Sequence, residues 1–571
     1  MQQVLQHPVI AVVFLIGILV FVHEFGHFIV GKIFGFGVET FSIGFGPRLF
    51  GFRHSGTDYR LSIIPLGGYV KFAGTVPSEP VVDRFKGQEM YKKPVWQRAL
   101  MTFAGPFANL LLAAAAFSYL GAEGIKHEAP VVGQVRPGAV AEKIGLLPGD
   151  HVTSIAGQEI NKWSELVELI SGSSEKEIEI KWRRNGEVLS GRLVPESEEV
   201  ENIKGEKIKV GRIGISHGFL PSKIAVVHES TAEKIGLKTG QKVVALSSEG
   251  TRKDVEKYYE FQEKLGEFYN AGKRSVTFVL EGLKDNSGKH AEDFVVVPLE
   301  ELKSKNLPKN NFRLGQLISK QLGVHDTSLV VAEVNKEEGA SEPLIKQSDF
   351  VEKIDGKEVS DIFDLQYFLV SNKKPVVGLT VTRDGKLKEF DVPLNAIEVQ
   401  KAKGKDIFYA FPGKFMGERI KPEPFVEKYD GLFSSIAFGI KRSLALSGQI
   451  VGALIGLITG DVPLGALGGP MLIAKVAGDS AALGLAAYLS TLAVISINLC
   501  MINLFPIPVL DGGQLVMLAA EAVKGSSLSE AAIENYQKIG FVMVMGLVLL
   551  STYNDLGRFW ASMLRTVGGG Q

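Results

Sequence analysis

The first apolar segment limits the fold of this chain more than any other part of it. From Pro8 to Val22 the sequence is an unbroken run of apolar residues and glycine, and it stays mostly apolar to Gly31. Inside it, residues 23–27 read His-Glu-Phe-Gly-His. Ionisable groups are costly to bury in lipid, so within a spanning segment they mark a functional site by default. We therefore expect an intramembrane site here.

The segment 23–27 has the spacing of a metal site. His23 and His27 are four residues apart, so on a helix both imidazoles leave the same face about one turn apart. Two ring nitrogens can then bind one zinc ion, with Glu24 as general base toward a zinc-bound water. A surface helix with two histidines is the alternative, but it would not follow fifteen uncharged residues. We interpret the segment as a metal site.

Four segments reach the length of a membrane span. They are Pro8–Lys32, Ala99–Ala122, one within Ser480–Leu510, and Ile539–Asn554. The segment Ser443–Thr459 follows Lys441 and Arg442 and is rich in Gly, Ser and Gln, so we expect a membrane-associated helix rather than a span. Residues 1–7 carry no Lys or Arg and no small-x-small cleavage site follows, so the first segment is expected to be retained.

The charged residues predict the orientation. Lys and Arg are frequent between the first two spans, at Lys32, Arg48, Arg53, Arg60, Lys71, Lys86, Lys92, Lys93 and Arg98. The positive-inside rule makes this loop cytoplasmic. The N-terminus and the stretch from about residue 123 to the third span are then extracytoplasmic, and residues 23–27 lie toward the cytoplasmic side. Over the whole chain 63 basic residues match 63 acidic ones, which gives no sign of nucleic-acid binding. A single cysteine, Cys500, excludes an intramolecular disulfide.

Residues 59–71 of the cytoplasmic loop are unusually apolar. They predict a β-hairpin that turns at Leu66-Gly67-Gly68 and dips into the membrane. Such backbone survives in lipid only if it is covered by protein or lines a cavity. A sheet edge beside a metal site could pair with an extended peptide. An ordinary interfacial hairpin is the alternative.

A third metal ligand is predicted in the C-terminal half. Asp511 is the only acidic residue in the apolar stretch Ser480–Ala520. Residues 503–513, Asn-Leu-Phe-Pro-Ile-Pro-Val-Leu-Asp-Gly-Gly, hold two prolines and two glycines, which break a helix and free backbone groups that protein or water must satisfy. A helix end with Asp511 in the interface is the alternative. A catalytic zinc needs three protein ligands, which favours the metal site.

Together these motifs resemble the site-2 protease family of intramembrane zinc metalloproteases, in its bacterial regulator-of-sigma-E protease type. Besides residues 23–27 and 503–512, the resemblance rests on the segments Gly44–Pro47, Ile64–Lys71, Gly105–Asn109 and Gly469-Pro470. It covers both membrane blocks, roughly residues 8–120 and 430–560.

The resemblance implies an enzyme that cuts peptide bonds within transmembrane segments of single-pass proteins such as anti-sigma factors, in the bacterial inner membrane. It implies zinc held by His23, His27 and Asp511, with Glu24 as the catalytic base. Cleavage would follow a first extracytoplasmic cut by a site-1 protease. The expected substrate-binding residues are Asn503, Pro65, Leu66, Gly67, Gly68 and Tyr69.

The charged middle of the chain carries a repeat. Residues 141–146, Ala-Glu-Lys-Ile-Gly-Leu, recur at 232–237, and a fainter third copy follows the first by 199 residues, with Asp150 matching Asp349. A period of 90–100 residues is that of a domain. The units resemble three tandem PDZ domains, which bind peptide ends by strand addition. Steric gating alone is the other interpretation. The family is expected to carry one or two such domains, so the role of the third stays open.

The resulting architecture is a polytopic α-helical membrane protein with about four transmembrane helices, a membrane-reentrant β-hairpin and an inserted extracytoplasmic tandem of PDZ-like domains. The expected domains are 1–122, 123–200, 201–305, 306–400 and 401–571. A metal transporter would need further ionisable residues, which the second and fourth spans do not offer. A catalytically inactive scaffold gives no reason for Glu24 beside three ligands. Zinc content measured together with cleavage of a membrane-span substrate separates these classes.

Overall fold

The computed structural model divides the chain into two compact units. Unit 1 holds Met1–Ile125 and Val426–Met563, and unit 2 holds Lys126–Phe425 with the last residues of the chain. The structure describes residues 8–201, 207–284, 290–299, 307–334, 344–359, 362, 365, 368, 369, 374–383, 386–401, 404–416 and 419–567.

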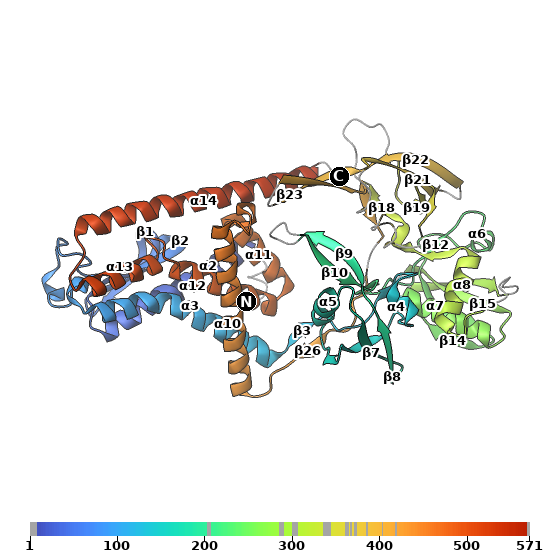
Figure 1. The fold of residues 1–571 in the computed structure, drawn as a ribbon, viewed down its shortest axis with the longest axis horizontal. Helices are drawn as coiled ribbons and strands as arrows, with labels where there is room; N and C mark the ends of the chain where they lie inside the picture. Colours follow the sequence, from blue (N-terminus) through green and yellow to red (C-terminus); the bar gives the residue numbers. More distant parts are fainter. Residues whose placement is uncertain are drawn as a thin grey trace. The chain divides into compact units, whose positions relative to one another are not determined.

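Unit 1 is built of helices and one sheet (Figure 1). Its helices are α2 (Pro8–Ile33), α3 (Val95–Glu123), α10 (Leu432–Thr459), α11 (Pro470–Leu483), α12 (Leu485–Leu504), α13 (Asp511–Lys524) and α14 (Glu530–Val567), with 3-10 turns at Asp83–Phe85, Met90–Lys92 and Leu464–Ala466. Among the described residues, five helices are long and apolar enough to cross a membrane, namely α2, α3, α10, α12 and α14.

Helix α10 differs from the segment expected there. It begins at Leu432, eleven residues before Ser443, so Lys441 and Arg442 lie inside it. Its buried stripe consists of small residues one turn apart, Ser435, Gly439, Ser443 and Ser447. A Cβ atom on Gly439 would lie 2.3 Å from the carbonyl oxygen of Ala114 in α3, so only glycine permits this contact. Figure 1 shows α10 crossing α3 at a steep angle.

The core of unit 1 is formed where α2, α3, α11 and α12 meet. A Cβ atom on Gly26 of α2 would lie 2.3 Å from the carbonyl oxygen of Ala104 in α3, so the two backbones touch here. Helix α12 is tied to both, because Tyr488 donates to the carbonyl of Ala11 at 2.7 Å and Ser496 to the carbonyl of Asn109 at 2.7 Å. These contacts fix the three helices around residues 23–27.

The sheet of unit 1 joins β1 (Val38–His54) and β2 (Thr57–Phe72). The chain reverses direction between residues 61 and 68, as the predicted hairpin requires, but the two arms lie on opposite sides of β1: residues 59–61 and 68–70 each pair with residues 41–43. A further, tight turn lies at Ser55-Gly56, where φ is 47° and 82°, the left-handed pair that a two-residue hairpin requires. Phe41 pairs with both Val70 and Tyr59, so the first part of β1 lies between two parts of β2.

Unit 2 contains three four-stranded antiparallel sheets with one strand order repeated. They run β6-β5-β7-β8, β14-β13-β15-β16 and β20-β19-β21-β22. Their strands are β5 (His151–Ile155), β6 (Gln158–Glu159), β7 (Ile178–Arg184), β8 (Glu187–Leu193), β13 (Val243–Ser248), β14 (Thr251–Asp254), β15 (Ser275–Lys284), β16 (His290–Pro298), β19 (Phe350–Ile354), β20 (Lys357–Glu358), β21 (Val376–Arg383) and β22 (Lys386–Pro393). The repeat seen in the sequence is therefore a repeat of structure.

Short strands and helices complete these three domains. They are β4 (Gln134–Val135), α4 (Val140–Lys143), α5 (Trp163–Ser171), β9 (Glu196–Glu201), β10 (Lys207–Arg212), β11 (Ile215–Ser216), β12 (Ile224–Val226), α6 (Thr231–Lys234), α7 (Tyr258–Asn270), α8 (Asn311–Leu322), β17 (Val324–Asp326), the 3-10 turn Thr327–Leu329, β18 (Val331–Val334), β23 (Asn395–Lys401), β24 (Gly404–Ala410) and β25 (Gly413–Phe415). Where the chain passes between the units lie β3 (Ile125–His127) and β26 (Phe425–Glu427).

One contact between a side chain and a backbone amide recurs at the same place in each repeat, and the accepting side chain is buried in the first and third. The Asp150 carboxylate accepts from the Leu147 amide and pairs with Arg184 at 2.6 Å. In the third repeat Asp349 accepts from the Lys346 amide and pairs with Arg383, again at 2.6 Å. In the second, Gln241 takes the place of the aspartate and accepts from the Lys238 amide at 2.8 Å.

The domain boundaries lie later than the sequence suggested. The first core extends to Ile213, and β11 pairs with β4. The second core runs from Leu220 to Val324, because β17 returns to pair with β12. The third includes Phe411, and β25 pairs with β18, so residues 404–415 belong with unit 2 and not with the C-terminal membrane block. Each observed boundary lies beyond the expected one because the last strand of the domain pairs with a strand far back in the sequence.

Candidate metal centre

The three predicted ligands come from two helices of unit 1. His23 and His27 lie one turn apart on α2 and are 8% and 9% exposed. Asp511 is the first residue of α13, directly after the interrupted stretch 505–510. Two glycines hold that helix start in place, because a Cβ on Gly512 or Gly513 would lie 2.3 or 2.2 Å from carbonyl oxygens of the preceding loop.

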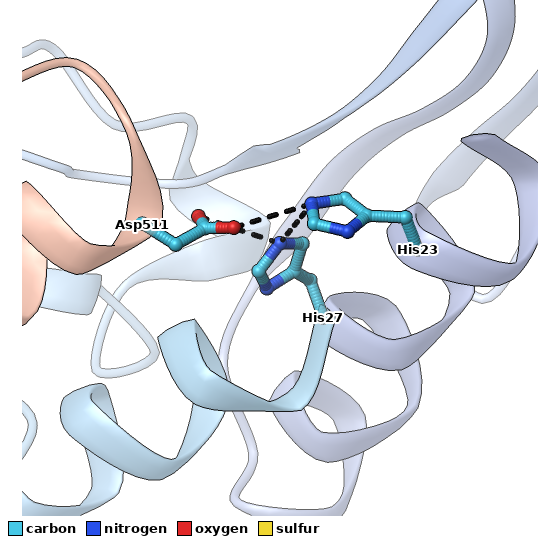
Figure 2. Close-up of side chains that lie close together, drawn as sticks. All are labelled: His23, His27 and Asp511. Carbon is cyan, nitrogen blue, oxygen red and sulfur yellow. Dashed lines mark hydrogen bonds and ion pairs between the residues drawn. The ribbon is translucent and has the colours of Figure 1, made fainter. Parts of the chain in front are cut away.

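The ligand atoms converge on one point (Figure 2). His23 Nε2 lies 3.2 Å from His27 Nε2 and 3.2 Å from Asp511 Oδ2, and His27 Nε2 lies 3.6 Å from Asp511 Oδ1. Among the described residues this is the one group of three or more His, Cys, Asp or Glu side chains close enough to hold a metal ion together.

These distances fit zinc. Ligands at about 2.0–2.1 Å from a tetrahedral ion lie about 3.3 Å from one another. The three observed separations of 3.2, 3.2 and 3.6 Å bracket that value. Two imidazole nitrogens that face each other and a carboxylate also require a proton or a cation between them. Two nitrogens and one carboxylate are a frequent donor set of catalytic zinc, which leaves a position open for water or substrate.

The remaining ring nitrogens are held by α3. His27 Nδ1 lies 2.9 Å from the carbonyl oxygen of Met101, to which it donates. His23 Nδ1 lies 3.2 Å from the side-chain amide of Asn109. Gly105 leaves room for His27, because a Cβ there would come within 2.2 Å of Nε2. These three positions on α3 hold both imidazoles, and metal-binding histidines are commonly oriented in this way.

The remaining predicted residues lie at different distances from this group. Asn503 Nδ2 is 3.5 Å from His23 Nε2, at the end of α12. Glu24 is half-buried and interacts with the backbone amide of Val70 in β2. A Cβ on Gly68 would lie 3.3 Å from Glu24 Cγ, so this part of β2 borders the centre.

The other predicted substrate-binding residues are on β2 as well. Tyr69 faces Arg60, which donates to its hydroxyl, and stacks on Phe45. A Cβ on Gly67 would meet the ring of Phe45. Pro65 and Leu66 continue the strand, and their side chains lie outside the described part of the chain.

Sequence reasoning missed the role of residues on α3. Asn109 and Gly105 were noted only as part of a motif that resembles the family. Their i, i+4 spacing places both on one face of a helix, but it does not show that this face packs against His23 and His27.

Helix α13, which begins with Asp511, is also fixed to α3. Arg98 and Glu521 form two parallel bonds, of 3.0 and 2.6 Å, and both side chains are nearly buried. Two parallel hydrogen bonds between a guanidinium and a carboxylate fix the relative orientation of the two side chains and add to the attraction between their charges. The helix that carries the carboxylate is therefore held against the helix that holds the imidazoles.

Known proteins resemble this chain over nearly its whole length. The family model for peptidase family M50 matches residues 11–547. The regulator of sigma-E protease RseP of Escherichia coli K12 is 28% identical over 555 residues, 95% of this chain and 97% of that protein. The RseP of Salmonella typhimurium 14028s is 27% identical over 559 residues, covering 96% and 98%.

One further relative resembles the whole chain, and one solved structure resembles a part of it. A Vibrio cholerae protein named as a zinc metalloprotease is 27% identical over 557 residues, covering 96% of this chain and 98% of that protein. Among solved structures, the PDZ domain of an SdrC-like protein of Listeria monocytogenes covers 16% of this chain and 90% of its own, at 18% identity and a TM-score of 0.13.

Proposed function

The chain belongs to peptidase family M50 and is a zinc-dependent protease, and we propose that it cuts peptide bonds inside the membrane with the centre formed by residues 23–27 and 511. We propose His23, His27 and Asp511 as the zinc ligands and Glu24 as the catalytic base. The observation that carries this assignment is the convergence of the three donor groups at separations of 3.2–3.6 Å.

The proposed chemistry divides between zinc and the protein. When bound, zinc acts as a Lewis acid that polarises the peptide carbonyl and makes water easier to deprotonate. Glu24 accepts the proton of the attacking water and delivers it to the leaving amine. Its place next to the imidazoles on α2 and beside β2 supports this role.

Substrate is proposed to bind as an extended strand. A peptide bond in a transmembrane helix has its carbonyl engaged in an i→i−4 bond, so the helix must unwind locally before it can be cut. The segment Pro65–Tyr69 of β2 borders Glu24 and is proposed to pair with the unwound stretch by strand addition. Asn503, 3.5 Å from His23, is proposed to hold the substrate backbone at the centre.

We propose that α2, α3, α12 and α14 cross the bacterial inner membrane and that α10 is membrane-associated. The N-terminus and unit 2 are then extracytoplasmic, and the centre lies toward the cytoplasm, since the basic loop between α2 and α3 follows the positive-inside rule. The sheet of β1 and β2 is the proposed reentrant element, because its large apolar side chains are exposed in the unit, including Phe50 at 73% and Phe52 at 63%.

The proposed substrates are single-pass membrane proteins of the anti-sigma-factor kind, after an upstream protease has removed most of the extracytoplasmic part. The names of the RseP relatives support this class. The three repeats of unit 2 are proposed to be PDZ-like domains that select trimmed substrates at the extracytoplasmic side.

The test of the proposal measures bound zinc and cleavage in the same preparations. Glu24→Gln should keep zinc and lower turnover of a membrane-span substrate by about 10²–10⁴-fold, because it removes a base and not a ligand. Asp511→Ala should lose zinc as well as turnover. Wild-type turnover in Glu24→Gln would remove Glu24 from the mechanism, and unchanged zinc in Asp511→Ala would move the third ligand elsewhere.

A further inference from the structure

Asn109 is a wholly buried amide beside the ring of His23, and which end of its carboxamide faces the ring has a chemical consequence. It lies on α3 and is 0% exposed. Its side-chain Nδ2 lies 3.2 Å from His23 Nδ1, whereas its Oδ1 is buried and makes no hydrogen bond in the described part of the chain. An unused acceptor therefore lies next to a ring nitrogen of a proposed ligand.

The two nitrogens of His23 have different surroundings. Nε2 faces Asp511 and the Nε2 of His27, so it is the atom that can bind a metal, and it must then carry no proton. A neutral imidazole keeps its proton on the other nitrogen. Nδ1 is therefore a donor and needs an acceptor, and the side chain of Asn109 is the partner recorded for it.

The two ends of a carboxamide have the same shape and differ only in their hydrogen bonding. A rotation of about 180° around the Cβ–Cγ bond of Asn109 exchanges the positions of Oδ1 and Nδ2 and moves no other heavy atom. This places Oδ1 opposite Nδ1 of His23 and gives the buried acceptor a donor. His27 already has this arrangement, since its Nδ1 donates to the carbonyl oxygen of Met101 at 2.9 Å.

We infer that Asn109 is a positioning residue whose Oδ1 accepts the Nδ1 proton of His23 and thereby keeps Nε2 free to bind the metal. Ser496 supports it from α12 by donating to its backbone carbonyl at 2.7 Å. The inference rests on the proposed ligand set. It gives the buried carboxamide oxygen a donor between apolar helices, where an unpaired polar atom is unfavourable.

The test compares zinc affinity of the purified full-length protein, measured by competition with a chelator, in matched variants. Asn109→Ala removes the acceptor and should weaken zinc binding by about 10–100-fold, the usual effect of losing such a partner. Asn109→Asp keeps an acceptor and should bind zinc within about threefold of wild type. The controls are Asn498→Ala and Asn498→Asp on α12, because Asn498 bonds only the carbonyl of Val494 in its own helix in the described contacts. Neither should change zinc affinity.

A second measurement does not depend on a variant that folds. In zinc-loaded wild-type protein labelled with ¹⁵N-histidine, Nδ1 of His23 should carry a slowly exchanging proton. A His23 ring without a proton on Nδ1, or wild-type zinc affinity in Asn109→Ala, overturns the inference. Asp511→Ala in the same assay separates the two proposals: if it loses zinc while Asn109→Ala does not, only the role of Asn109 fails, and if it binds zinc as wild type does, the ligand set fails and the role of Asn109 with it.

Discussion

Replacing Gly105 with alanine is the sharpest single perturbation of the centre. The new Cβ would lie 2.2 Å from Nε2 of His27, against an ordinary contact of 3.4 Å or more, so the ring must retreat by about 1.2 Å. That is more than half of a zinc–nitrogen bond of about 2.0–2.1 Å. Disturbing the groups that orient a metal ligand typically lowers metal affinity by about 10–100-fold, and a displacement this large belongs at the upper end, about 100-fold. We expect zinc affinity to fall by about that factor, which is about 2.7 kcal/mol.

The matched control is Gly17→Ala on α2, where a Cβ would meet nothing within 4 Å. Alanine favours a helix over glycine by up to about 1 kcal/mol at both positions. At Gly105 this offsets part of the about 1–3 kcal/mol by which overpacking destabilises the metal-free protein. The assay is chelator competition for zinc, with thermal unfolding of the metal-free forms as the check on folding. If Gly105→Ala binds zinc as tightly as Gly17→Ala, the packing of α3 against His27 does not fix the ligand and the reasoning is wrong.

Three further predictions concern unit 2. Arg383→Ala leaves the wholly buried Asp349 uncompensated and should destabilise the third repeat by about 3–5 kcal/mol in denaturant unfolding, more than Arg184→Ala does in the first, because Arg184 is more exposed; equal effects would contradict this. Burial lowers the pKa of His325, so its stabilising effect is present above about pH 6.5 and is lost as the pH falls; unfolding midpoints at pH 7.5 and 5.5 should therefore differ less in His325→Gln than in wild type. Deleting residues 128–424, which follows the unit boundary, should let the enzyme cut substrates that keep a bulky extracytoplasmic domain; continued rejection of these with normal cleavage of trimmed substrate would exclude size selection by unit 2.

The centre was largely predictable because its signals are local. The i, i+4 histidines are set by helix geometry alone, and the broken stretch before Asp511 shows in its prolines and glycines. Asn109 was not predictable as a partner of His23, because the two are 86 residues apart and meet only through the packing of α2 on α3. Pairings of this kind depend on tertiary structure that no local pattern encodes.

The errors in the fold have the same origin. The hairpin expected over residues 59–71 does reverse close to Gly67, where φ is 128°, but residues 41–43 of β1 lie between its two arms, and no pattern within the hairpin shows this. The repeat was visible in residues 141–146 and 232–237, but its boundaries were not. They depend on β17 and β25, which close each domain by pairing far back along the chain.

The position of Asp511 in the sequence has a consequence during synthesis. It follows His23 by 488 residues, so on the proposed ligand set the centre cannot assemble until nearly the whole chain has been made. At 5–20 residues per second that is roughly 25–100 s after His23 is made. A nascent or truncated chain would carry both imidazoles and Glu24 without a third ligand. The order of the chain itself would thus keep the protease inactive toward neighbouring membrane proteins until its own folding is complete.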